Sequence, residues 1–149
     1  MFNNRYMRLA LLEAKYAKEK NEVPVGSVIV LDGEIIGRGH NQSILNNDPT
    51  SHAEIEAIRD ATRNIRNYRL KGADIYTTLE PCAMCYGAIV QSRISNIFFG
   101  AFDPKSGVCG SCENFKDKKF FNHQPNVLGH IMEEDCSRIL KDFFRFKRS

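Results

Sequence analysis

The chain has 149 residues, the size of one ordinary domain, and is long enough to bury a single sizeable core. Hydrophobic residues make up 42% of the sequence and charged residues 26%, a balance that excludes an intrinsically disordered chain. No apolar run approaches the roughly 18 residues that cross a membrane, and the N-terminus lacks the apolar core of a signal peptide. We therefore expect a cytoplasmic protein without membrane contact, and a net charge of +3 is too small to identify a partner.

The first third of the chain predicts a helix followed by a hairpin. Apolar residues recur at helical spacing from Met7 to Ala17 while charged residues occupy the other faces, as in a surface helix packed on a core. The apolar segments 28–31 and 34–36 flank Asp32-Gly33, a pair that suits a tight type I′ turn. These segments are therefore expected to pair as antiparallel strands.

The middle of the chain alternates expected helices and strands. After an asparagine-rich loop over 41–50, we expect a helix from about His52, a strand at 73–79, a helix from Pro81 to about Ser92 and a strand at 96–100. Pro81 suits the first helical position because its missing N–H would have no helical partner there.

The last third is expected to be loop over 101–125, with a possible short helix, then a strand at 127–131 and a helix at 133–146. Strands that alternate with helices after a hairpin predict a layered α/β domain whose sheet begins antiparallel and continues in parallel. No repeat, low-complexity tract or linker divides the chain, so we expect a single domain over residues 1–149.

The C-terminal segment, Lys141 to Ser149, interleaves four basic residues and one acid with Phe143, Phe144 and Phe146. One interpretation is an amphipathic helix with its aromatic residues in the core. The other is an RNA-contacting end, with cations for phosphates and aromatic rings for stacking on bases.

Two local motifs indicate a metal site: Ser51-His52-Ala53-Glu54 and Pro81-Cys82-Ala83-Met84-Cys85. Each lies where a helix is expected to begin, and the partial positive charge of a helix N-terminus favours thiolate over thiol. Cys82 and Cys85 are three residues apart, so they lie on the same side of the first turn. If the two helix starts face each other, one imidazole and two thiolates can bind one Zn²⁺.

Three protein ligands leave one tetrahedral position for water, which is typical of catalytic zinc. Zinc lowers the pKa of bound water to about 7. Glu54, two residues after His52, is then placed to receive the proton.

Each motif alone has a simpler interpretation. Glu54 could complete a capping box with Ser51, and one Cys-x-x-Cys could be a redox pair. A second pair, Cys109-Gly-Ser-Cys112, could complete a four-cysteine structural zinc site. That site would need a wide gap of 23 residues between the pairs, and it would leave His52 and Glu54 without a purpose.

The joint occurrence of His-x-Glu and Pro-Cys-x-x-Cys instead resembles the known signature of zinc nucleobase deaminases. Five cysteines, an odd number, argue against a disulfide scaffold. We expect Cys109 and Cys112 to be loop thiols and Cys136 to be a half-buried helix residue.

Nearly the whole chain resembles the bacterial tRNA-specific adenosine deaminase family, within the cytidine deaminase-like superfamily. The zinc motifs specify only the superfamily, whereas the flanking stretches and the Phe-Phe-Arg near the C-terminus resemble the tRNA enzyme. The resemblance runs through residues 22–26, 39–41, 48–55, 67–70, 78–85, 99–103, 105–107 and 142–145. It implies a three-layer α/β/α fold with a five-stranded mixed sheet flanked by helices, a homodimer, and conversion of adenosine to inosine at the wobble position of the tRNA anticodon loop.

The resemblance also implies roles for single residues. His52, Cys82 and Cys85 match the zinc ligands, and Glu54 the proton shuttle. The implied substrate contacts are Asn41 to the flipped base, Val23 and Pro24 in the pocket wall with Ala53 beside them, Asp103 to the sugar-phosphate, and Phe144 and Arg145 to the anticodon loop. Asn41 and Asp103 could equally be turn residues. Cys109-Gly-Ser-Cys112 departs from the family, which usually has small non-cysteine residues there.

The mechanism expected from this resemblance is hydrolytic. Water activated by zinc attacks C6 of an extruded adenine, while Glu54 carries a proton to N1 and then to the departing ammonia. Two alternatives remain: a deaminase of free nucleobases or nucleosides such as guanine or cytosine, and a non-catalytic RNA-binding module stabilised by zinc.

Overall fold

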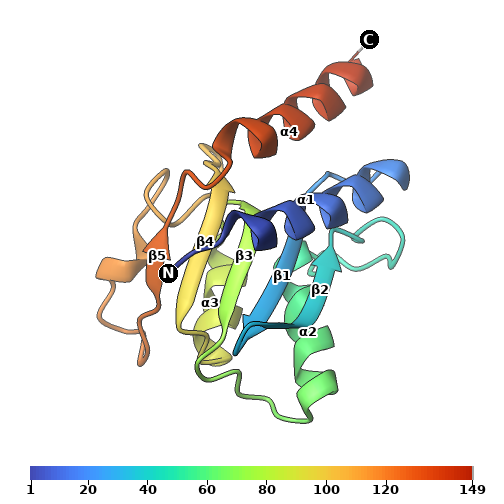
Figure 1. Ribbon diagram of the computed structural model, residues 1–149. Helices are drawn as coiled ribbons and strands as arrows, with labels where there is room; N and C mark the ends of the chain where they lie inside the picture. The colour runs from blue at the N-terminus through green and yellow to red at the C-terminus, as the bar shows by residue number, and fades with distance from the viewer. Residues whose placement is uncertain (149) are drawn as a thin grey trace.

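The computed structural model describes residues 1–148, with side chains through residue 147; Ser149, the end of the basic segment, lies outside the described residues. A five-stranded sheet with strand order β2-β1-β3-β4-β5 forms the centre (Figure 1). The elements in chain order are α1 (Asn4–Glu19), β1 (Gly26–Leu31), β2 (Glu34–His40), α2 (Ala53–Ile65), β3 (Asp74–Leu79), α3 (Ala83–Gln91), β4 (Asn96–Ala101), a short 3-10 helix (Phe115–Asp117), β5 (Asn126–Leu128) and α4 (Glu133–Arg148).

Strand directions bring several chain segments to one edge of the sheet. β1 is antiparallel to both β2 and β3, whereas β3, β4 and β5 are parallel, which confirms the expected hairpin followed by parallel strands. Asp32 and Gly33 both have positive φ, as a type I′ turn requires. The ends of β2, β3 and β4 and the start of β1 therefore lie at the same edge, and the loops that leave this edge are neighbours.

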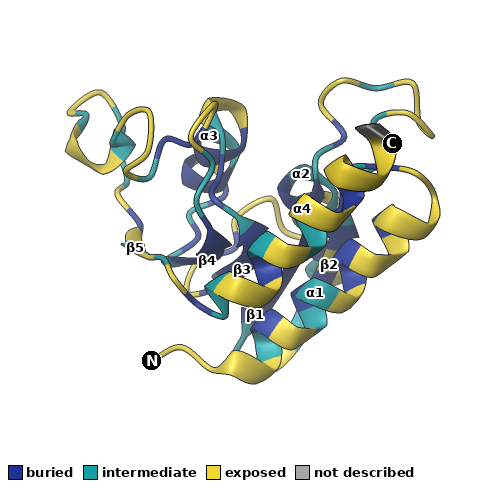
Figure 2. Cartoon of the chain, turned by 90° about the horizontal axis from the view of Figure 1, so that it is seen from above, coloured by how far each residue is buried: buried dark blue, intermediate teal, exposed yellow. Residues whose placement is uncertain are grey.

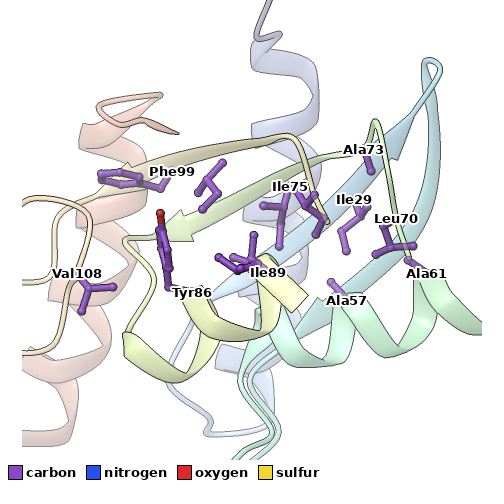
Figure 3. Close-up of a cluster of buried hydrophobic side chains, with 13 residues drawn as sticks. Ile29, Ala57, Ala61, Leu70, Ala73, Ile75, Tyr86, Ile89, Phe99 and Val108 are labelled. Atoms are coloured by element: carbon purple, nitrogen blue, oxygen red, sulfur yellow. The ribbon is translucent and has the colours of Figure 1, made fainter. Parts of the chain in front are cut away.

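Helices cover both faces of the sheet, which confirms the three-layer α/β/α architecture. α1 and α4 lie on one face and α2 and α3 on the other (Figure 2). The cluster on the α2–α3 side joins Ile29, Ile75 and Phe99 of the strands to Tyr86 and Ile89 of α3 (Figure 3). A second cluster, on the other face, packs α1 and α4 against the outward side of the same strands.

Close backbone contact fixes where α2 begins. A Cβ atom at Gly39 of β2 would lie 2.4 Å from the backbone nitrogen of Ala57 and 2.5 Å from the oxygen of Ala53. The helix face toward the sheet is built from small residues, Ala53, Ala57 and Ala61, all fully buried. The first turn of α2 is therefore held against the end of β2.

Two expected boundaries were wrong. Pro81 is not the first helical residue: α3 begins at Ala83 and its N-cap is Cys82. The last strand ends at Leu128 rather than at residue 131, because the chain turns through positive φ angles at His130 and Met132. Extended pairing with β4 cannot continue through residues in that conformation.

Of the three aromatic residues near the C-terminus, one lies in the core and two are exposed, so each of the two interpretations applies to part of the helix. Phe143 is 7% exposed, whereas Phe144 is 44% and Phe146 is 81% exposed. Cys136, expected to be half-buried, is fully buried. The first turns of α4 thus pack on the sheet, and its C-terminal end extends beyond the strand ends (Figure 1). Among the described residues, no helix combines the length and apolar character that a bilayer span requires.

Candidate metal centre

Three predicted ligands meet where α2 and α3 begin. The Nδ1 atom of His52 lies 3.7 Å from the Sγ atom of Cys82 and 3.6 Å from that of Cys85. Within the described residues, these three form the one His, Cys, Asp or Glu group arranged to hold a metal ion. The sequence prediction of the ligand set is therefore supported by the geometry.

The two helix N-caps leave their side chains available for metal binding. An N-cap side chain usually accepts a hydrogen bond from the first turn of its helix, but His52 and Cys82 make no such bond. Their backbone oxygens accept the first helical hydrogen bonds, from the N–H groups of Glu56 and Tyr86. The capping box of Ser51 with Glu54 is thus wrong, because Ser51 lies outside the cap and donates to Glu56.

The spacing of the donor atoms suits zinc. Zn–N bonds of about 2.1 Å and Zn–S bonds of about 2.3 Å, at a tetrahedral angle, place nitrogen and sulfur about 3.6 Å apart. Both observed nitrogen–sulfur separations lie within 0.1 Å of that value, at 3.7 and 3.6 Å. One imidazole and two sulfurs fill three corners of a tetrahedron and leave the fourth to water or substrate.

Protonation of the ligands is coupled. The pKa of Cys82 is lowered to about 4, chiefly because Cys85 donates a hydrogen bond to its sulfur. The pKa of Cys85 is raised, chiefly by the same contact and then by burial. The pKa of His52 is raised, chiefly by its hydrogen bond with Cys82. These shifts favour the thiolate form of Cys82, and a divalent cation would favour deprotonation of the second thiol as well.

Glu54 lies beside the ligands in the first turn of α2. Its side chain is buried, and burial raises its pKa to about 7, while hydrogen bonds from its own backbone N–H and from Cys85 act in the opposite direction. A carboxyl group with a pKa near neutrality can both accept and donate a proton at cellular pH. Glu54 is therefore suited to proton transfer at the open position.

A cavity of about 170 Å³ opens at the ligands. Three of the residues predicted to bind substrate line it, Val23, Asn41 and Asp103. The Oδ1 atom of Asn41 accepts the N–H of Ala53 at 2.8 Å, which leaves the Nδ2 group as a donor. Asn41 thus ties the end of β2 to the start of α2 and also faces the cavity.

The remaining predicted contacts lie elsewhere. Pro24 is buried next to Val23, and Ala53 contributes its N–H to Asn41, but neither lines the cavity. Phe144 and Arg145 belong to α4 and are exposed. The substrate roles of these four residues stay predictions.

Two buried carboxylates that hold loops near the site, Glu22 and Glu80, were not predicted from the sequence. Glu22 accepts the N–H groups of Ile44 and Leu45, which fixes the loop that follows Asn41. Glu80 lines the cavity and binds the loop that contains Asp103. An acidic residue directly before Pro-Cys, at the end of an apolar strand, was the available signal for Glu80.

A larger groove of about 720 Å³ lies between α1 and α4. No cysteine or histidine lines it, and Lys15 and Arg138 face it together with Asp135 and Asp142. Because the groove has mixed charges and no soft metal ligands, it is not suited to bind zinc.

Cys109 and Cys112 take no part in the metal group, so the four-cysteine site is wrong. The Cys112 thiol donates instead to the backbone oxygen of Pro104. Burial raises the pKa of Cys109 to about 12, which disfavours the thiolate that a metal needs. Both residues lie in the loop after β4, as expected.

Comparison with known proteins places these features in one family. Residues 2–101 match the family described as the cytidine and deoxycytidylate deaminase zinc-binding region. The chain is 47% identical over 140 residues to a tRNA-specific adenosine deaminase of Bacillus subtilis, covering 94% of this chain and 87% of that one. It is also 47% identical over 148 residues to a protein of the same name from Haemophilus influenzae, covering 99% and 86%.

Solved structures of deaminases are also similar to this chain. A structure from a study of A-to-I editing by tRNA:A34 deaminases at the wobble position superposes with a TM-score of 0.90 at 44% identity, covering 93% of this chain and 100% of that one. A guanine deaminase from Bacillus subtilis superposes with a TM-score of 0.66 at 30% identity, covering 100% and 96%.

The ligand assignment predicts the metal content of cysteine variants. Cys82→Ser should lower zinc well below one ion per chain, because a hydroxyl group is a poor zinc ligand in a site built for thiolate. The matched control, Cys109→Ser with Cys112→Ser, should keep one zinc per chain. Metal analysis of the purified proteins measures both, and loss of zinc in the control would favour the four-cysteine site.

Proposed function

The chain belongs to the cytidine and deoxycytidylate deaminase zinc-binding family, and on that premise we propose that it converts adenosine to inosine at the wobble position of a tRNA anticodon. The observation that carries the proposal is a three-ligand metal site with an open position beside buried Glu54. A closed site with four protein ligands would have no place for water or substrate.

His52, Cys82 and Cys85 would hold the zinc ion. When bound, zinc acts as a Lewis acid that lowers the pKa of water toward 7. The fixed helix starts orient the three ligands, and burial of Cys85 limits access of bulk water to its sulfur. The chain itself would thereby determine which coordination position is left for water or substrate.

Glu54 would move the protons of the reaction. Hydrolytic deamination adds water at C6 of adenine and releases ammonia, so a proton must pass from water to the ring nitrogen N1 and another to the departing amine. A carboxyl group with a pKa of about 7 can make both transfers without leaving the site.

The cavity residues would position the base. The Nδ2 donor of Asn41 suits a ring nitrogen acceptor, because its Oδ1 is already bound by Ala53. Val23 would supply an apolar wall, and Asp103, which also lines the cavity, would contact the sugar-phosphate. Adenosine in an anticodon loop is unpaired, so its extrusion costs less than extrusion from a duplex.

The relatives favour tRNA over free nucleobases as the substrate. The chain is 47% identical to proteins named tRNA-specific adenosine deaminase and 30% identical to a guanine deaminase. The non-catalytic RNA-binding module is disfavoured, because it gives no purpose to a buried carboxyl group beside an open metal position.

We propose that the C-terminal helix extends the substrate contact. α4 begins beside Gly100 near the end of β4, and β4 leads directly to Asp103. Exposed Phe144 and Arg145 offer a ring for base stacking and a cation for phosphate. We propose that Phe144 and Arg145 bind the anticodon loop.

We further propose that the protein acts as a homodimer through α3. This helix carries no charged residue, and apart from Gln91 at its end its outward side consists of small or apolar groups such as Met84, Gly87 and Ala88. A helix with so few polar groups is usually covered. A second copy is the matching partner, because an apolar patch complements itself across a two-fold axis.

Residues 1–149 are proposed to form one deaminase domain in the cytoplasm. The cavity takes residues from Val23 to Ser106, which span most of the sheet, and the described cysteines are free thiols, as a reducing compartment maintains.

Replacement of the proton carrier tests the mechanism. Glu54→Ala should keep zinc and lower the rate of inosine formation by roughly 10²–10⁴-fold, because general acid–base help is lost. Glu56→Gln, two residues further along α2, is the matched control and should stay near the wild-type rate.

The assay follows ammonia and inosine with an anticodon stem-loop RNA and, in parallel, with free nucleosides and guanine. Full activity of Glu54→Ala would remove Glu54 from the mechanism. Activity confined to the free compounds would support the alternative substrate class.

Substitutions in α4 test the RNA contact. Phe144→Ala with Arg145→Ala should weaken stem-loop binding by about tenfold or more and reduce the dependence of log Kd on log salt by about one unit. Lys119→Ala with Phe120→Ala removes one cationic and one aromatic side chain from another exposed segment and should leave Kd unchanged. Equal effects of the two double variants would show that α4 has no specific role.

A charge on α3 tests the dimer. Ala88→Glu should shift the protein to monomers in analytical ultracentrifugation, because the two-fold axis brings two like charges into one apolar interface. Leu12→Glu, at an exposed position of α1, is the control and should not change the mass. A monomeric wild type would end the dimer proposal outright.

A further inference from the structure

We propose that Glu80 is a positioning residue for the reaction: its carboxylate holds the loop of residues 103–111 over the metal cavity and so sets where the substrate is bound. The inference rests on the proposed function for the identity of the substrate. The contacts that support it come from the structure of the loop itself.

The Glu80 side chain is 2% exposed and receives hydrogen bonds from a single loop. Its Oε1 atom accepts the N–H of Asp103 at 2.9 Å and the hydroxyl of Ser111 at 2.5 Å. Its Oε2 atom accepts the N–H of Cys109 at 2.8 Å and the N–H of Ser111 at 3.1 Å. Oε1 therefore binds the loop both near its start and near its end, and Oε2 binds it near its end.

The buried carboxylate of Glu80 needs the hydrogen bonds that this conformation of the loop supplies. A buried carboxylate without partners is strongly unfavourable, and the described residues supply no ion pair to Glu80. The loop N–H groups are thus its compensation. Hydrogen bonds to an ionised acceptor are about twice as strong as neutral ones, so the loop gains stability from the same contacts.

The loop backbone also packs directly on the carboxylate. A Cβ atom at Gly107 would lie 2.2 Å from Cδ of Glu80, so only glycine allows this approach. The N–H of Val108 donates to the oxygen of Pro81, the residue that follows Glu80. The path of the loop is thus determined from its start to its end by the segment that joins β3 to α3.

This segment also leads to the metal ligands. The N–H of Glu80 donates to the oxygen of Ala101 at the end of β4, and Cys82 follows two residues later. Asp103 and Ser106, both in the loop, line the cavity. Glu80 thereby fixes the distance between the cavity wall and the metal centre without itself carrying a proton in the reaction.

The test replaces Glu80 by glutamine, which keeps its size but turns one acceptor oxygen into a donor group that faces loop N–H groups. Amide hydrogen exchange of Asp103, Cys109 and Ser111 should accelerate by about tenfold or more in the zinc-loaded protein, with β3 and β4 unchanged. The KM for an anticodon stem-loop RNA should rise by a similar factor, while kcat changes little and zinc content stays the same.

Glu113→Gln is the matched control, because it alters an exposed carboxylate of the same segment that pairs with Lys118. It should change neither exchange nor KM. Ser111→Ala, which removes only the hydroxyl donor, should change both in the same direction by less, and it keeps the proposal testable if Glu80→Gln fails to fold.

Unchanged exchange and KM in Glu80→Gln, or a loss confined to kcat, would overturn the proposal. Equal effects of Glu80→Gln and Glu113→Gln would also overturn it, since loss of any nearby carboxylate would then loosen the loop as much as loss of Glu80. The exchange measurement needs no substrate, so it stands even if wild-type protein does not deaminate tRNA, an outcome that would end the proposed function alone.

Discussion

The structure depends on the meeting of two helix N-termini at one edge of the sheet. His52 and Cys82 are both N-cap residues, and neither uses its side chain to cap its helix. Their nitrogen and sulfur lie 3.7 Å apart. Partial positive charge at each helix start favours thiolate at the site, and the two side chains that do not cap their helices remain available to bind a metal ion. The arrangement is stable only if strands, loops and helices all place these two starts face to face.

Buried carboxylates around this edge have different roles because their partners differ. Glu22 and Glu80 are each 2% exposed and bind loop N–H groups, so their charge is compensated by backbone dipoles. Glu54 has few such donors, and burial raises its pKa to about 7. The same type of side chain therefore stabilises a loop where backbone donors surround it, and has a pKa near neutrality where few donors do.

Much of the site could be predicted because its signals are local. Helical spacing placed Cys82 and Cys85 on one side, and the Asp32-Gly33 turn predicted the hairpin, although a bulge between Ile29 and Val30 shifts its register further from the turn. The role of Glu80 was not predicted, because its partners are contributed by residues 103–111, which are remote in the sequence. The start of α3 was also misjudged, because a proline suits positions on either side of an N-cap when only its missing N–H is considered.

By itself the sequence determined the element types, the two metal motifs and the presence of a carboxyl group, Glu54, beside them, since periodicity and short spacings are properties of neighbouring residues. Only the tertiary structure decided which cysteine pair joins His52, and that Phe143 is buried while Phe144 and Phe146 are exposed. Those outcomes depend on strand order and register, which set what lies beside a residue across long stretches of chain. A motif specifies its own local geometry, but the packing of the whole sheet determines which residues lie next to it in space.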